Sequence, residues 1–105
     1  MNFSERLKTL PSIAHLAALQ LLDAQGQVVA TIENKPGQAG SVAVYHALAQ
    51  QHGGAITPEA AALGLEWYAE HTADARAFPG KHPNIDRLLG WAQGSASYSA
   101  KLLPA

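Results

Sequence analysis

The chain has 105 residues, of which 48% are hydrophobic and 14% are charged, and its formal net charge is -1. This balance removes the simplest electrostatic argument for nucleic acid or an anionic membrane as a partner, although it leaves room for a local basic patch. The apolar content excludes a disordered chain. There is no cysteine, which excludes disulfides, thiolate metal sites and a cysteine nucleophile.

Length and composition predict a single globular domain over residues 1–105. The first ten residues carry Glu5, Arg6 and Lys8 among their apolar positions, which does not fit a secretion signal. No stretch approaches the roughly 20 apolar residues that span a bilayer. We therefore expect a cytoplasmic protein with neither a membrane nor a nucleic-acid partner.

The first half of the chain predicts a short helix, a hairpin and a second helix. The short helix covers residues 2–10 and ends at a proline. Residues 16–23 and 27–33 form two antiparallel strands joined at Gln25-Gly26, since the second stretch is rich in β-branched side chains. The next helix opens at Gly40-Ser41 and ends at two glycines. Its predicted apolar stripe is Val44, Tyr45, Leu48 and Ala49.

The second half is predicted to be mainly helical. Thr57 is an N-cap followed by a proline and an acid, so one long helix is expected from there to about Arg76. The turn Phe78-Pro79-Gly80 breaks it, and a shorter helix follows over residues 83–93. The tail, residues 95–103, is a candidate third strand. The fold class is therefore α+β, with a small antiparallel sheet packed against three to four helices.

The hydrogen-bonding side chains are concentrated between residues 70 and 87. Extending the apolar stripe of the long helix by steps of four and three reaches His71 and then Asp74, so its buried face is expected to turn polar. His82 and Arg87 return at the start of the next helix. We therefore predict one contiguous polar cluster as the candidate ligand-binding site, made of His71, Asp74, Arg76, His82 and Arg87.

Several roles for this cluster stay open. It can bind a small anion or a charged group of a protein partner. Alternatively, His71 or His82 acts as the acid–base of a small enzyme, with Asp74 or Asp86 orienting the ring. A purely structural role, in which buried polar groups hydrogen-bond the Pro79-Gly80 turn, is the more common case. No metal is predicted because no specific ligand pattern is present, and no cofactor motif is found.

A weaker candidate is the glycine-bearing loop between the second strand and the helix that follows. Backbone amides at such a helix start can bind an anion. The spacings of a P-loop and of a dinucleotide fingerprint are absent, so no nucleotide is predicted. A tight turn followed by a Ser41 cap explains the same residues. The candidate anion-binding residues are Lys35, Gly37, Gly40 and Ser41.

Three segments carry a resemblance: IENKPG at residues 32–37, YAEHT with DAR within residues 68–76, and PGKHPNIDRL at residues 79–88. They resemble a family of short proteobacterial proteins catalogued only as a domain of unknown function. The resemblance covers essentially the whole chain and implies a bacterial, stand-alone protein, with no activity or site residue attached. From the residues alone we favour a binding or interaction protein over an enzyme. A third alternative is a homodimeric interaction module without a small-molecule site, and a homodimer is compatible with all three readings.

Overall fold

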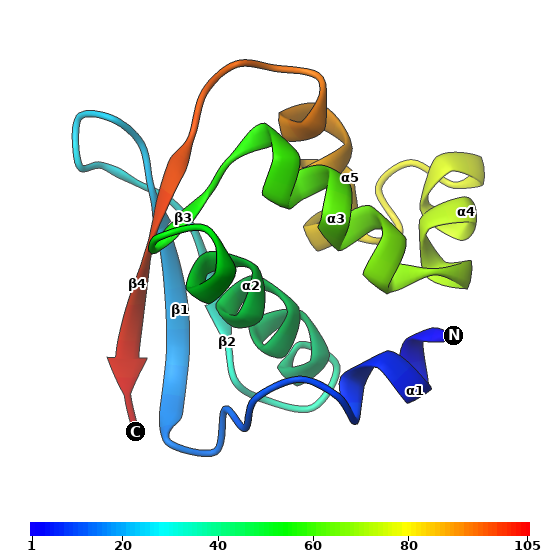
Figure 1. Cartoon of the computed structure of the whole chain (residues 1–105), viewed down its shortest axis with the longest axis horizontal. Coiled ribbons are helices and arrows are strands. Elements are labelled where there is room, and N and C mark those ends of the chain that lie inside the picture. Colours follow the sequence, from blue (N-terminus) through cyan, green and yellow to red (C-terminus); the bar gives the residue numbers. More distant parts are fainter.

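The computed structural model describes residues 1–105 as an antiparallel sheet with helices on one side of it (Figure 1). Its sheet has four strands in the order β2-β1-β4-β3, which confirms the predicted α+β class. In chain order the elements are α1 (Phe3–Leu7), β1 (Leu16–Leu22), β2 (Val28–Glu33), α2 (Ala39–Gln51), β3 (Ala55–Ile56), α3 (Pro58–Tyr68), α4 (Glu70–Ala77), α5 (Pro83–Ala92) and β4 (Tyr98–Pro104).

Strands β1 and β2 form the predicted hairpin. Leu19 lies opposite Ile32 and both are buried, so this pair contributes to the core face of the sheet. In the turn, the Asp23 carboxylate accepts hydrogen bonds from the amides of Gln25 and Gln27, both at 2.9 Å. Gly26 has a φ of 79°, a conformation that glycine adopts without steric cost.

The C-terminal tail forms the predicted third strand, and it occupies an interior position in the sheet. Strand β4 pairs with β1 on one side, with Leu19 opposite Leu102, and with β3 on the other. The two residues of β3 pair with Ser99 and Tyr98. The sequence analysis did not predict β3, because two residues are too short to produce an alternation pattern.

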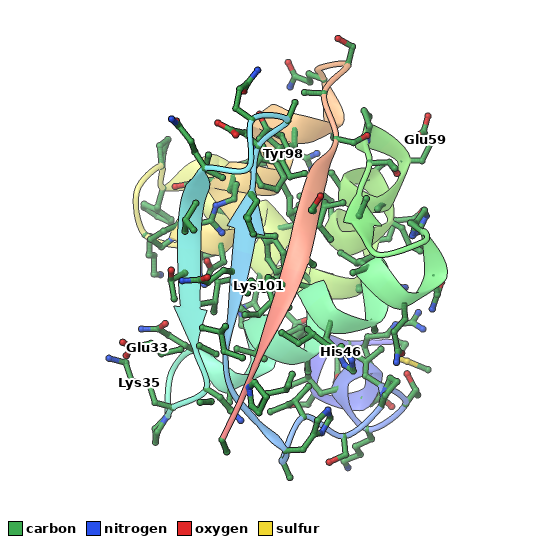
Figure 2. The ribbon with its side chains drawn as sticks, turned by 90° about the vertical axis from the view of Figure 1, so that its left-hand side faces the viewer. Glu33, Lys35, His46, Glu59, Tyr98 and Lys101 are labelled. Atoms are coloured by element: carbon green, nitrogen blue, oxygen red, sulfur yellow. The ribbon has the colours of Figure 1, made fainter.

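Helix α2 lies between the sheet and the remaining helices (Figure 1). Every residue from 42 to 49 is buried, so the predicted stripe of four residues is correct but too narrow. A helix that is apolar on all sides is buried on all sides. The opposite face of the sheet is free of helices, and Lys101 lies on it (Figure 2).

The predicted long helix is wrong, because the chain breaks at Ala69 into α3 and α4. Ala69 has a φ of 51° and a ψ of -116°, outside the helical region. The Thr72 hydroxyl donates to the carbonyl of Leu65 at 2.6 Å and so satisfies a carbonyl near the end of α3. The break rotates the following residues, and the buried positions of α4 are Thr72 and Ala75 rather than the predicted His71 and Asp74.

None of the five helices combines the length and the apolar character that crossing a bilayer would demand.

Candidate functional site

A cleft of about 380 Å³ opens where four parts of the fold meet: α1, the start of α2, the α3–α4 junction and the start of α5. It brings the two stretches singled out from the sequence together, although 29 residues of the chain separate Ser41 from His71. The side chains and backbone that line it are those of Phe3, Leu7, Gly37, Ala39, Gly40, Ser41, Tyr68, His71, Lys81, His82, Pro83, Asn84 and Ile85.

A histidine and a lysine at the polar end of the cleft share one carboxylate partner, Asp74, which is not itself a lining residue. Nε2 of His82 lies 2.6 Å from Oδ2 of Asp74, and Nζ of Lys81 lies 2.9 Å from the same oxygen. The hydrogen bond with His82, followed by the one with Lys81, holds the pKa of Asp74 below its ordinary value of 3.8. Asp74 is therefore a carboxylate at neutral pH, and it fixes the orientation of the His82 ring.

The second histidine of the cleft, His71, is close to the first. The two ring centroids are 5.8 Å apart, and the edge of the Phe3 ring meets His71 at 5.2 Å. The carboxylate of Glu70 is more distant, with Oε2 3.9 Å from Nε2 of His71. Hydrogen bonds from its own amide and then from that of Phe3 lower the pKa of Glu70. His71 therefore faces the cleft without the close carboxylate partner that His82 has.

The start of α2 forms another wall of the cleft, through Ala39, Gly40 and Ser41. Ser41 is not the predicted cap, because the helix begins at Ala39 and Gln38 is the N-cap residue. Instead the hydroxyl of Tyr68 donates to Oγ of Ser41 at 2.7 Å. Burial raises the pKa of Tyr68, so this phenol stays protonated. The last candidate of this loop, Lys35, is not among the residues of the cleft and pairs with Glu33 at 2.8 Å on the surface.

Helices α2 and α5 begin at the cleft without a side-chain cap, unlike α1. The N-cap residues, Gln38 of α2 and His82 of α5, make no capping hydrogen bond. The His82 ring turns to Asp74, and the Gln38 side chain accepts from the amide of Glu33 at 3.2 Å. The positive ends of both helix dipoles therefore face the cleft, which favours a negative charge there.

A polar network centred on the buried Tyr45 adjoins the cleft through Asn84, and the sequence analysis missed it. The Tyr45 hydroxyl donates to the carbonyl of Asn84 at 2.6 Å and accepts from Nη1 of Arg87 at 3.2 Å. Arg87 also donates to the side chain of Asn84 at 2.8 Å. Burial raises the pKa of Tyr45 to about 12. The sequence did contain a signal for this network, because Tyr45 lies in the predicted apolar stripe. A buried tyrosine hydroxyl needs a hydrogen-bond partner, so its position indicates a polar side chain or carbonyl nearby.

The predicted five-residue cluster is thus only partly assembled. His71, Asp74 and His82 lie together, whereas Arg87 belongs to the buried network around Tyr45. Arg76 is separate: it is exposed and lines another, shallower hollow on the far side of α4 and α5, with Asp86. No three histidine, cysteine, aspartate or glutamate side chains are grouped so that they could hold a metal ion.

Fold and cleft together define a small α+β protein with a polar, partly enclosed pocket at the junction of its helices. The chain belongs to the family described as an uncharacterized protein conserved in bacteria (DUF2322), whose profile matches residues 3–102. This confirms the resemblance to a bacterial domain of unknown function, while the family description is not restricted to proteobacteria. No curated protein and no solved structure matches the chain.

Proposed function

We propose that the protein binds a small anionic molecule in the cleft between α1, α2 and α5. The observation that carries the proposal is the convergence of two stretches, residues 37–41 and residues 71–85, on one cavity. Each stretch was identified from the sequence for its capacity to bind an anion. Convergence of distant polar segments on one partly enclosed hollow is typical of binding sites.

The charges around the cleft favour an anion of modest charge. Lys81 and His82 supply positive or hydrogen-bonding groups, but both contact Asp74, which offsets part of their charge. The lysine side chain is 57% exposed, and exposed ion pairs contribute only about 0–1 kcal/mol. Lys81 can therefore leave Asp74 and turn to a ligand at little cost.

The volume and the wall chemistry further restrict the ligand. A cavity of about 380 Å³ is at the lower end of the range for small-molecule sites, so the ligand is compact. The rings of Phe3 and Tyr68 stack with centroids 5.0 Å apart and, with Leu7, form an apolar side. The cleft thus has one polar end and one apolar side. A ligand with one anionic group and a small apolar or planar body, such as a carboxylic acid or a phosphomonoester, matches both.

The direct test is calorimetric titration of the full chain with inorganic phosphate, acetate and benzoate, compared between two lysine variants. We expect Lys81→Ala to weaken binding several-fold and Lys101→Ala to leave it unchanged. Both substitutions remove one positive charge, but Lys101 lies on the open face of the sheet, remote from the cleft (Figure 2). Equal effects of the two variants, or no binding of any probe, would contradict the proposal.

A second candidate function is acid–base catalysis by His82. The observation that favours it is the 2.6 Å contact of Nε2 with the Asp74 carboxylate, which leaves Nδ1 of a cleft-lining ring to exchange a proton. His71 has no such partner, since its nearest carboxylate is at 3.9 Å. The test is turnover of p-nitrophenyl esters and phosphates by wild type, His82→Gln and His71→Gln. Activity abolished only by His82→Gln would support this function, and equal activity of all three chains would refute it.

A further inference from the structure

Helix α1 is nearly independent of the rest of the chain in its hydrogen bonds. Asn2 and Glu5 form a reciprocal capping box at its start, with bonds of 2.8 and 3.0 Å. The amides of Arg6, Thr9 and Leu10 bond to carbonyls within residues 2–7. A single hydrogen bond joins residues 1–10 to other elements, from the amide of Phe3 to the Glu70 carboxylate at 3.0 Å, and it is exposed.

Side chains, rather than hydrogen bonds, hold α1 in place. Phe3, Leu7 and Leu10 are partly buried against the core. Phe3 stacks on Tyr68 and meets His71 edge-on, and Arg6 covers the ring of Trp67 at 5.6 Å. No residue of α1 is fully buried. The packing of α1 also leaves one polar atom unsatisfied, because Nε of Arg6 is buried without a hydrogen-bond partner. An unpaired buried donor opposes the closed position, since moving α1 away returns that group to water.

The attachment of α1 suits a hinge. The first firm anchor after the helix is the carbonyl of Ile13, which accepts from the side chain of Asn34 at 3.0 Å and from the amide of Leu16. Between Leu10 and Ile13 the backbone makes no hydrogen bond to other elements. Pro11 lies in this stretch and has no amide to donate. Residues 1–10 can therefore turn as one body about residues 11–12.

We propose that α1 is a lid of the cleft, which swings about residues 11–12 to admit the ligand and closes on it through Phe3 and Leu7. The inference rests on the proposed function of the cleft as a binding site. Gly40 shows how closely the closed lid approaches: a β-carbon there would lie 3.4 Å from Cζ of Phe3 and 3.5 Å from Cδ1 of Leu7. Because Phe3 and Leu7 line the cavity beside the start of α2, displacement of α1 opens the cleft to solvent.

Spin-label distance measurements on the full chain test the lid, and the absence of cysteine makes specific labelling simple. One pair, Ser4→Cys with Gln50→Cys, joins exposed positions of α1 and α2, and the control pair, Ala73→Cys with Gln50→Cys, joins α4 to α2. We expect two populations for the first pair and one for the control. Adding Phe3→Ala should raise the open-to-closed ratio by roughly two- to tenfold, as loss of a stacked aromatic pair does.

The outcomes separate the lid from the proposed function. A single narrow distance for the Ser4 pair, the same with and without Phe3→Ala, would overturn the lid, and the control pair verifies that Phe3→Ala leaves the fold intact. Inorganic phosphate that binds by calorimetry should shift the Ser4 pair toward the closed distance, and binding without any shift would also overturn it. Two populations that respond to Phe3→Ala while phosphate fails to bind would retain the moving α1 and reject the anion site.

Discussion

Gly64, in the middle of α3, lies where α3 packs closely against both α2 and α5. A β-carbon built on it would lie 2.8 Å from Cδ1 of Leu48 on α2 and 2.8 Å from Cδ1 of Leu88 on α5. Both leucines are completely buried, so neither side chain can move into free space. We expect Gly64→Ala to force a shift of both side chains at once.

Two opposing effects set the magnitude. Alanine is favoured over glycine in a helix interior by about 1 kcal/mol, whereas overpacking a core costs about 1–3 kcal/mol. Gly90 on α5 offers a matched control, since it is exposed and helical and a β-carbon there meets nothing within 4 Å. Gly90→Ala should therefore stabilise the protein by about 0.5–1 kcal/mol, and Gly64→Ala should have a free energy of unfolding about 1–3 kcal/mol lower than Gly90→Ala.

The assay is urea unfolding followed by circular dichroism, with free energies taken from the midpoints and slopes. Equal changes for Gly64→Ala and Gly90→Ala would refute the packing argument, because helix propensity alone would then account for both. A second comparison tests the identity of the contact. Leu48→Ala should cost less in the Gly64→Ala background than in wild type, since the added methyl group then occupies part of the space that Leu48 leaves.

Trp67→Ala should lower the free energy of unfolding by about 3–5 kcal/mol, because Trp67 is 6% exposed within the core; an unchanged urea midpoint would exclude that packing. Tyr45→Phe should cost about 1–3 kcal/mol in the same assay by removing the hydrogen bonds of its hydroxyl with Asn84 and Arg87, and a neutral result would mean that water replaces the hydroxyl. Asp74→Asn should destabilise at neutral pH, because the folded-state pKa of Asp74 lies below its ordinary 3.8. That contribution is lost as pH falls through the folded pKa, so the two unfolding curves should converge in acid and remain apart above pH 3.8, and a difference that is constant with pH would contradict the bond to His82.

Local chemistry made the hairpin and the starts of most helices predictable from sequence. The turn at Gln25-Gly26 and the cap at Thr57, whose hydroxyl accepts from the amide of Ala60 at 3.0 Å, depend on residues within a few positions of one another. The break at Ala69 has no such signal, since neither glycine nor proline is near it. An alanine with positive φ is held there by the surrounding packing, which a local pattern does not encode.

That one break explains why the candidate site was predicted only in part. The sequence argument placed His71 and Asp74 by continuing the register of α3, so it put them inside, whereas both are partly exposed and only His71 lines the cleft. Arg76 was grouped with them because it belongs to the same polar stretch, and it lies elsewhere. The sequence analysis did not assign Phe3 and Tyr68 to the site, because their contact joins segments far apart in the chain. Such contacts are set by the tertiary fold.

The interior position of β4 in the sheet has a consequence for how the protein is made. Strand β1 has its hairpin partner β2 within a few residues, but its other edge stays open until residues 98–104 have left the ribosome and paired with it. A nascent chain that already contains β1, β2 and α2 therefore exposes an unpaired strand edge next to apolar surface, the kind of surface that chaperones bind and that aggregates form from. Closing so long a loop is also slow, so the pairing of β1 with β4 is expected to be a late folding step.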